Sequence, residues 1–574
     1  MVSGVGTLVD LLRWRAGTLE GDRGYTFLLD GERAEVSITY QDLDIHARAI
    51  AALLQQRGHQ GGRVLLLYPS GLQFITAFFG CLYARAVAVP APLPENERAT
   101  ARLSNLMADA RPTAVLSLAS VTDTLRSTFS AASGDRQPEW MATDDVPLSL
   151  SIDWREPACE ESDVAFLQYT SGATSDPRGV EVTHGNIVAN QRAIAAAFQH
   201  DVESPVVGWL PLYHDMGLIG NVMHPLYVGS SCVLLSPEAF LQQPLRWLRA
   251  IDRYRGTTSG GPNFAYDLCA RKATVAETQR LDLSCWRIAF NGSEPVQART
   301  LERFAATFAP AGFRSDAWLP CYGLAESTLL VSGGPRGGGA SARSYAFAPD
   351  GSVSVADGID GASQSRPIVS CGESCDDQRL VIADADGRRC PDRMVGEIWL
   401  SGPSVARGYW QRPTETQQTF EAVLSTGEGP FLRTGDLGFR DGRDLFVTGR
   451  CKDVILLRGA NYYPQDIEQA AVSASPRLRA GGAAAFGVDG DGRERVVLAH
   501  EVAQVDSQEA ERVVERIRHH VLEATHVALD CVVLLEAGTI ARTPNGKIQR
   551  QACRTAFMNN ALSIVHRWET ALEA

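Results

Sequence analysis

The sequence predicts a layered α/β protein: a large N-terminal domain of parallel sheets with helices and a small β subdomain, followed by a small α+β C-terminal domain. Three observations predict it. Short β-rich runs alternate with amphipathic helical segments over about 64–323. After Glu326 the pattern changes to a Gly- and Ser-rich loop and then to short strands with turns. Beyond Arg450 a compact α+β pattern follows, so we place the two domains at 1–451 and 452–574.

The β-rich runs of the large domain are short and apolar, as buried parallel strands are. They read VLLLYPSG, AVAVPAP, AVLSLAS, VAFLQYTSG, VVGWLPL, CVLLSP, TTSGGP and WRIAFNGS. Helical patterns such as QDLDIHARAIAALLQQRG and NIVANQRAIAAAFQH fall between them. Strand, helix and strand in succession build parallel sheets covered by helices, so this architecture is expected here.

The second half of the chain begins with a Gly- and Ser-rich segment at 332–344, which we expect to be a surface loop. Short strands separated by turns follow, and we assign them to a β subdomain at about 345–448. In the C-terminal domain, β-rich runs such as DVILLRG, RVVLAHEVAQV and CVVLLEAG alternate with helical patterns such as SQEAERVVERIRHHVLEA. That mixture predicts a compact α+β fold.

Composition excludes several classes of protein. The 574 residues are 45% hydrophobic and 8% aromatic, as in ordinary globular proteins with more than one domain. A net charge of -13 argues against nucleic acid as the main ligand. Asp10, Arg13 and Arg15 interrupt the apolar N-terminal stretch, so we expect no membrane span and a cytoplasmic protein. The lone C-x3-C of Cys371 and Cys375 does not predict a zinc site.

The strongest local motif, YTSGATSDPRGV, ends the β-rich run that begins at Val164. A loop of small residues lets backbone N–H groups close around phosphate oxygens. Thr170, Ser171 and Thr174 add hydroxyl donors, and Gly172 leaves room for the approach. Taken alone, the segment could equally be an ordinary Ser/Gly turn. It lacks the Walker A pattern G-x-x-x-x-G-K-[ST].

This segment and six others, in the same order, resemble signatures of the adenylate-forming (ANL) superfamily. The six others read WLPLYHDMGLIG, FNGSEPV, CYGLAEST, LRTGDLGF, GRCKDVILLRGANYYPQDIE and RTPNGKIQR. The variants YHDMG, NGSEP, YGLAES and NYYPQDIE are most similar to the fatty acyl-AMP ligase branch. The resemblance implies that ATP activates a carboxylic acid, expected to be fatty, to acyl-AMP with release of pyrophosphate. The acyl group then passes to the phosphopantetheine thiol of a holo acyl carrier protein.

The resemblance also implies a nucleotide site. Tyr322 matches the residue that stacks on adenine, and Glu326 matches the carboxylate that binds Mg²⁺. Asp436 matches the acid that accepts the ribose hydroxyls, and Arg450 an arginine near the ribose and α-phosphate. Taken singly, Glu326 could be an acid at a helix start, and Asp436 and Arg450 a surface ion pair. The full expected ATP/AMP-binding set is Thr170, Ser171, Gly172, Thr174, Asn291, Gly292, Ser293, Tyr322, Gly323, Leu324, Ala325, Asp436 and Arg450.

The expected catalytic residues are Lys547, Glu326 and His214. Lys547 matches the lysine that bridges the acyl carboxylate and the α-phosphate, where a positive charge lowers the repulsion between two anions. His214 matches a histidine beside the acyl pocket, with a gating or positioning role. Lys452 matches the hinge about which the C-terminal domain moves in related enzymes. The alternatives are a solvated surface lysine at 547 and a hydrogen-bonded core histidine at 214.

The acceptor of the acyl group is predicted from the length of the chain between Glu326 and Cys371, which exceeds what we expect of acyl-CoA ligases. Fatty acyl-AMP ligases resemble this chain in carrying an insertion here, which we place at about 344–369, and they use coenzyme A poorly. The alternative is a loop without catalytic effect. Met223 and Phe264, with His214, are expected to line the acyl pocket, although such residues are more often core filler.

Two other functions compete with this reading. An acyl-CoA ligase would perform the same activation with coenzyme A as the acceptor. A non-catalytic nucleotide-binding relative would be expected to lose some of the machinery, whereas Glu326, Asp436, Arg450 and Lys547 are all present.

Overall fold

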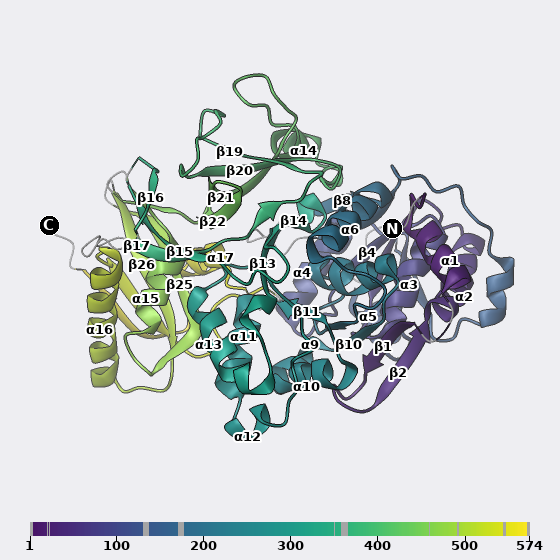
Figure 1. Ribbon diagram of the computed structural model, residues 1–574, viewed down its shortest axis with the longest axis horizontal. Helices are drawn as coiled ribbons and strands as arrows, with labels where there is room; N and C mark the ends of the chain where they lie inside the picture. The colour runs from purple at the N-terminus through teal and green to yellow at the C-terminus, as the bar shows by residue number, and fades with distance from the viewer. Residues whose placement is uncertain are drawn as a thin grey trace.

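The structure is a computed structural model that describes residues 4–19, 21, 23–129, 137–169, 177–348, 350–356, 365–457, 460–490, 493–543 and 547–570 (Figure 1). It confirms the predicted α/β class. Two large sheets lie within the N-terminal part, β-rich segments follow, and a smaller α+β unit ends the described chain. Among the described residues, every helix is too short or too polar to span a bilayer.

The first large sheet is parallel apart from its last strand. Its order is β6 (Glu139–Ala142), β5 (Ala114–Ser117), β3 (Arg63–Leu67), β4 (Val87–Ala91), β7 (Val164–Tyr169) and β8 (Gly179–Thr183). Leu65 and Leu67 of β3 pack with α4 and α5 on one face, whereas Val64 and Leu66 face the main core. The continuous apolar run of β3 therefore reflects burial on both faces.

The second large sheet carries parallel strands in its centre and antiparallel strands at both edges. Its order is β18 (Glu373–Ser374), β14 (Leu330–Gly333), β13 (Trp318–Gly323), β12 (Ile288–Asn291), β11 (Thr258–Gly261), β9 (Val206–Gly208), β10 (Cys232–Leu235), β1 (Gly24–Leu28) and β2 (Glu35–Thr39). The carboxyl ends of β12 and β13 lead into the segments FNGS and YGLAES, so the sheet brings these two motifs together.

Helices cover both sheets. They are α1 (Leu8–Thr18), α2 (Tyr40–Gln56), α3 (Leu72–Tyr83), α4 (Glu97–Ala110), α5 (Ala119–Phe129), α6 (His184–Phe198), α7 (Asp215–Gly217), α8 (His224–Val228), α9 (Pro237–Gln242), α10 (Leu245–Tyr254), α11 (Asn263–Lys272), α12 (Val275–Thr278), α13 (Ala298–Phe308) and α14 (Pro413–Phe420). Helix α3 contacts β1 of one sheet and β3 and β4 of the other, so it lies between them. Phe74, Phe78 and Phe79 are buried there, which explains why α3 is apolar on every face.

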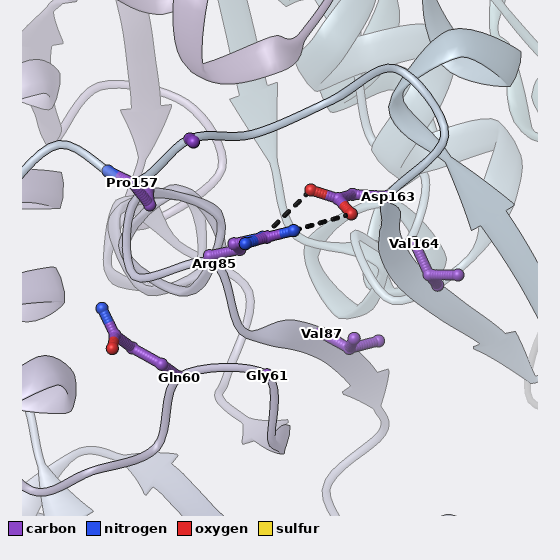
Figure 2. A pocket seen from close by; sticks show the side chains of 8 residues that line it. Gln60, Gly61, Arg85, Val87, Pro157, Asp163 and Val164 are labelled. Atoms are coloured by element: carbon purple, nitrogen blue, oxygen red, sulfur yellow. Dashed lines mark hydrogen bonds and ion pairs between the residues drawn. The ribbon is translucent and has the colours of Figure 1, made fainter.

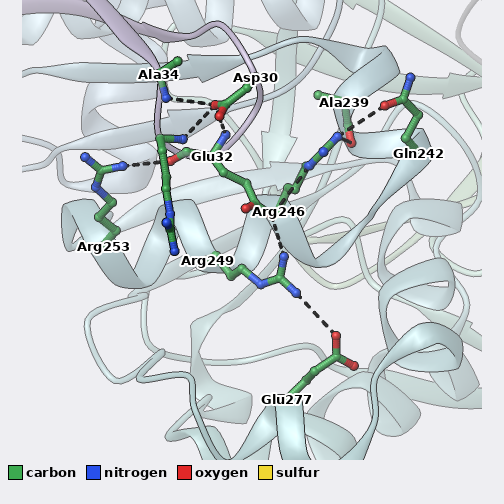
Figure 3. Close-up of polar contacts among 10 residues, drawn as sticks. Asp30, Glu32, Ala34, Ala239, Gln242, Arg246, Arg249, Arg253 and Glu277 are labelled. Carbon is green, nitrogen blue, oxygen red and sulfur yellow. Dashed lines mark hydrogen bonds and ion pairs between the residues drawn. The ribbon is translucent and has the colours of Figure 1, made fainter.

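Polar contacts fix the β1–β2 hairpin against α10 (Figure 3). Arg249 donates to Glu32 at 2.6 Å, and Arg253 donates to the backbone carbonyl of Glu32 at 2.8 Å. In the turn itself, Asp30 accepts three backbone N–H groups of residues 32–34. Exposed ion pairs contribute at most about 1 kcal/mol each, so this network orients an edge of the sheet more than it stabilises the fold.

The β-rich part consists of two antiparallel sheets. One has the order β16 (Val353–Val355), β15 (Ala342–Phe347) and β17 (Ser365–Val369), and these strands lie within or overlap the expected insertion at 344–369. The other has the order β19 (Arg379–Ala383), β20 (Gly396–Ser401), β21 (Leu432–Asp441) and β22 (Asp444–Arg450). The domain boundaries drawn from the sequence stay a prediction.

The residues from Ile455 onward have a core of their own, and we call them the C-terminal unit. A hairpin of β23 (Ile455–Leu457) and β24 (Ala460–Tyr462) leads into a sheet of β25 (Leu478–Gly490), β26 (Arg493–Val502), β27 (Cys531–Leu535) and β28 (Ile564–Glu569). Helices α15 (Pro464–Val472) and α16 (Ser507–Thr525) cover one face of the sheet, and α17 (Arg550–Met558) packs on the other.

A buried histidine predicts acid sensitivity of the fold. His184, at the start of α6, is 3% exposed and accepts the Leu8 N–H through Nδ1 at 3.3 Å. Burial lowers its pKa to about 4. Below pH 6.5 this histidine is protonated in the unfolded chain but stays neutral in the folded chain. Its contribution to the free energy of unfolding is therefore complete above pH 6.5 and falls by about 1.4 kcal/mol per pH unit as the pH drops towards 4. Urea unfolding of the protein and of His184→Gln at pH 7.5 and 5 should show a smaller loss in the variant. An equal loss in both proteins would contradict the assignment.

Candidate active site

Three of the sequence-predicted residues meet at Asp436. Tyr322, at the end of β13, donates its hydroxyl to Asp436 Oδ2 at 2.8 Å. Arg450 donates from Nε to Asp436 Oδ1 at 3.0 Å. Asp436 and Arg450 stand opposite each other in the ladder of β21 and β22, which explains a contact between residues fourteen positions apart. Asp436 is 7% exposed, so its carboxylate is held in a defined place by two donors.

Glu326 lies close to this cluster, in the short 3₁₀ turn Ala325–Ser327 that follows β13. Tyr409 donates its hydroxyl to Glu326 Oε1 at 2.9 Å. Burial raises the pKa of Glu326, and the hydrogen bond from Tyr409 and the charge of Arg450 oppose that rise. Sequence reasoning missed Tyr409, which lies between β20 and α14, in a segment that also forms an antiparallel bridge to Val180 in β8.

The backbone around the end of β12 is tightly shaped. A Cβ on Gly292 would lie 2.8 Å from the carbonyl oxygen of Cys321, and one on Gly323 only 1.8 Å from that of Leu329, so each position requires glycine. Ser293 adopts the left-handed region with φ 72°. Leu324 and Ala325 follow directly after Gly323 at the end of β13, and Ala325 is buried.

The side chain of Asn291 is fully buried at the end of β12. Within the part of the chain that the structure describes, neither its amide nitrogen nor its amide oxygen has a hydrogen-bond partner. Buried amides without partners are rare, so this one fits a polar group that belongs to a ligand.

Lys547 of the C-terminal unit is half-buried against this site. Burial lowers the pKa of its amine, the charges of Asp215 and Glu294 oppose that effect, and the charge of Arg450 adds to it. Glu294 accepts the Phe264 N–H at 2.7 Å, and burial raises its pKa. The sequence motif FNGSEPV contains Glu294, yet nothing in the pattern marked its electrostatic interaction with the lysine. The structure thus places a cation from one unit among carboxylates from the other.

His214 and Asp215 form the next part of the site. His214 Nδ1 lies 2.6 Å from Asp215 Oδ1, at the start of α7. Burial raises the pKa of Asp215, but His214 and Lys547 outweigh it, so the pKa lies below its ordinary value. A π-helical turn, Leu218–Met223, follows directly, and such turns are frequent at functional sites.

The expected acyl-pocket residues lie in two surroundings. Met223 is fully buried in the π-helical turn. Phe264 is half-buried near Trp209, with ring centroids 6.1 Å apart, and its backbone N–H is the donor to Glu294. Phe264 is therefore joined to the lysine site, whereas Met223 has the surroundings of a core residue.

Two further sequence predictions concern connecting segments. Thr170, Ser171, Gly172 and Thr174 lie outside the described residues, although Tyr169 and Pro177 on either side of them are described. Lys452 lies in the turn between β22 and β23, where Gln551 donates to its backbone carbonyl at 2.9 Å. Its role as a hinge stays a prediction.

A solvent-open cavity of about 540 Å³ lies elsewhere (Figure 2). Val87 and Val164, which line it, begin β4 and β7, so the cavity lies at the amino ends of these strands. Ligands of open α/β sheets bind at the carboxyl ends. Arg85 binds Asp163 through Nε at 3.1 Å and Nη2 at 3.2 Å, so the charges in the cavity satisfy each other. This cavity is not the candidate active site.

Comparisons with known proteins agree with this geometry. The family described as AMP-binding enzyme matches residues 16–410, and the family described as Disco-interacting protein 2-like, AMP domain, matches residues 452–567. The medium-chain-fatty-acid–[acyl-carrier-protein] ligase JamA of Moorena producens is 42% identical over 579 residues, which cover 99% of this chain and 97% of JamA. The chain belongs to the fatty acyl-AMP ligase branch of the AMP-binding, adenylate-forming superfamily.

Solved structures show the same relationship. The fatty acyl-adenylate ligase of Legionella pneumophila, in complex with acyl adenylate and pyrophosphate, has a TM-score of 0.76 and 38% identity, and the match covers 99% of this chain and 98% of that chain. A fatty acyl-adenylate ligase structure from studies of the Escherichia coli and L. pneumophila enzymes has a TM-score of 0.88 and 31% identity, covering 97% and 98%. The resemblance deduced from the sequence motifs is confirmed.

Proposed function

We propose that the chain uses ATP to convert a fatty acid to acyl-AMP with release of pyrophosphate and then transfers the acyl group to the phosphopantetheine thiol of an acyl carrier protein. One observation carries the proposal. The Tyr322–Asp436–Arg450 cluster, Glu326 and the half-buried Lys547 come from distant parts of the chain and gather at one place. The names of JamA and of the Legionella complex, which speak of a fatty-acid carrier-protein ligase and of acyl adenylate, support it.

The residues suit separate tasks in this reaction. Tyr322 offers an aromatic ring to adenine, and Asp436 offers carboxylate oxygens to the ribose hydroxyls. Lys547 brings a positive charge to the point where a carboxylate attacks the α-phosphate, and its half-buried position strengthens the effect of that charge. His214 and Asp215 stand beside the lysine and are suited to orient the acyl carboxylate.

Glu326 fits a magnesium ligand. It is a half-buried, hard oxygen donor next to the Tyr322–Asp436–Arg450 cluster, and Tyr409 fixes one of its two oxygens by a hydrogen bond. Among the described residues, no group of three or more His, Cys, Asp or Glu side chains could hold a metal by itself, which suits an ion shared with substrate phosphates. A bound Mg²⁺ would neutralise phosphate charge.

Replacing Tyr409 with phenylalanine should weaken divalent-cation binding while preserving the fold. The ring remains, but Glu326 loses the donor that fixes its carboxylate, so the concentration of Mg²⁺ needed for half-maximal activity should rise about threefold to tenfold. Electron paramagnetic resonance of Mn²⁺ titrated in the presence of ATP should show the same shift. Phe420→Leu, which changes the ring against which Tyr409 packs, is the control. Unchanged Mn²⁺ affinity in Tyr409→Phe would contradict the role of this hydrogen bond.

The insertion gives the acceptor part of the proposal its structural support. Arg366 of β17 forms an ion pair with Asp466 of the C-terminal unit and lies 4.4 Å from the ring centroids of both Phe347 and Tyr463. The insertion therefore contacts the unit that carries Lys547. A loop without effect on catalysis would not need such a contact.

The decisive experiment supplies ATP, Mg²⁺ and a panel of carboxylic acids, and follows acyl-AMP by mass spectrometry with and without coenzyme A or a holo carrier protein. We expect acyl-AMP from fatty acids and an acylated carrier protein. Absence of acyl-AMP with every acid would contradict the proposed activation. Efficient formation of acyl-CoA would contradict the acceptor and favour the acyl-CoA ligase.

A further inference from the structure

We propose that Arg102 is a positioning residue that holds Lys547 in place for adenylate formation and releases it for acyl transfer. This inference rests on the proposed function. Arg102 lies in α4, and its Nη2 donates to Gln549 Oε1 of the C-terminal unit at 3.1 Å. The two residues are 447 positions apart, and Gln549 follows Lys547 by two residues. The contact therefore joins the N-terminal part of the chain to the segment that carries the lysine.

Backbone contacts hold the described residues on both sides of Lys547. Thr543 donates its N–H to the Lys547 carbonyl at 2.8 Å, and Thr543 Oγ1 accepts the Lys547 N–H at 3.1 Å. Gln549 donates its N–H to the Ala541 carbonyl at 2.8 Å, and Arg542 and Ile548 form an antiparallel bridge. In an extended segment, side chains two residues apart point to the same side. A bond that fixes Gln549 therefore also fixes the position of Lys547.

Helix α4 is a firm base for this contact because its other end is bound to the sheet. Asp109, two helical turns after Arg102, lies on the same face of α4. Asp109 Oδ2 accepts the Tyr169 hydroxyl at 2.6 Å, and Asp109 Oδ1 pairs with Arg412 at 3.2 Å. Both carboxylate oxygens are used, and α4 cannot shift without breaking these contacts.

The partners of Asp109 give α4 a second connection to the site. Tyr169 immediately precedes residues 170–176, and Pro177, whose carbonyl accepts from Arg412 at 3.3 Å, immediately follows them. The sequence assigns phosphate binding to that segment. One face of α4 is thus connected both to the residues that flank 170–176 and, through Arg102, to the segment that carries Lys547. Arg102 therefore fixes the lysine relative to the place where the triphosphate is expected.

The chemistry of the pair suits a contact that forms and breaks in each cycle. The acceptor, Gln549, is a neutral amide. Separation of the two units therefore breaks no ion pair and leaves only one charged group to be hydrated. An arginine–carboxylate pair at the same place would bind more tightly. Gln549 therefore favours one arrangement of the units without locking it.

Substitutions at this contact should affect adenylate formation and acyl transfer in opposite ways. In Arg102→Ala, formation of acyl-AMP from acid and ATP should fall about tenfold, which corresponds to the loss of one charged hydrogen bond. Transfer from supplied acyl-AMP to a holo carrier protein should be unchanged or faster. In Gln549→Glu, the pair becomes ionic, so adenylate formation should be retained while transfer slows several-fold. A merely structural contact would lower both half-reactions together.

A swap of the two side chains provides rescue. Arg102→Gln combined with Gln549→Arg restores a donor and an acceptor across the contact and should recover most of the adenylate formation lost in either single variant. Arg126→Ala, which removes an exposed arginine from α5, is the control and should leave both half-reactions unchanged. Melting temperatures verify folding, and Gln549→Ala tests the contact from the other side if Arg102→Ala does not fold.

The outcomes separate this inference from the proposed function. If the unmodified protein forms no acyl-AMP, the proposed function fails. If it is active but Arg102→Ala and Gln549→Ala leave the ratio of the two half-reaction rates unchanged, the positioning role of Arg102 is overturned while the proposed function stands.

Discussion

Lys547→Ala should reduce acyl-AMP formation by about 10²- to 10³-fold, the usual cost of removing one preorganised charge from a transition state. The reason is geometric and electrostatic. Lys547 is half-buried near the carboxylates of Asp215 and Glu294, and the attacking carboxylate and the α-phosphate are both anionic. Single-turnover assays that follow acyl-AMP by mass spectrometry measure the effect.

The same variant should keep two other properties. We expect nucleotide binding to depend on Tyr322 and Asp436, so ATP affinity measured by calorimetry should change little. Transfer from supplied acyl-AMP needs no charge at the α-phosphate and should persist. Lys272→Ala, which removes an exposed lysine at the end of α11, is the matched control. Normal acyl-AMP formation by Lys547→Ala would refute the role given to this residue.

The sheets could be predicted from the sequence because burial leaves a clear pattern in it. In β3, both faces are covered, so Val64 to Leu67 are all apolar, and a short continuous apolar run predicts a buried parallel strand. Strand β28, by contrast, has mostly exposed residues and reads IVHRWE. It is a strand because it pairs with the edge of β27, and this pairing depends on tertiary structure.

The members of the Tyr322–Asp436–Arg450 cluster could be selected from the sequence because each lies inside a motif whose backbone requirements are strict, and their role in nucleotide binding stays a prediction. Gly292 and Gly323 each touch a neighbouring carbonyl closely enough to forbid a side chain, so these segments allow few alternatives. Residues that only position other site residues are not marked by a sequence motif of this kind. Tyr409 reaches Glu326 across 83 positions, and Arg102 reaches Gln549 across 447, and both contacts depend on how whole elements pack. Periodicity and motifs carry no information about such pairs.

Asp436→Ala should lower kcat/KM for ATP by about a hundredfold, while the KM for the fatty acid changes little. The substitution removes the expected acceptor of the ribose hydroxyls, and it also leaves the Tyr322 hydroxyl and the Arg450 guanidinium without the carboxylate that both use. Loss of one partner of such a network costs about 3 kcal/mol, because the remaining groups are left poorly satisfied.

Asp436→Asn separates the contribution of the acceptor oxygen from that of the negative charge. The amide keeps the shape and one acceptor oxygen, so Tyr322 can still donate, but the charge that pairs with Arg450 is gone. We therefore expect kcat/KM for ATP in Asp436→Asn to lie between the values of the unmodified protein and of Asp436→Ala. ATP affinity measured by calorimetry should follow the same order. If Asp436→Ala bound ATP as tightly as the unmodified protein, the carboxylate would serve only to join β21 to β22, and the nucleotide would have to lie elsewhere.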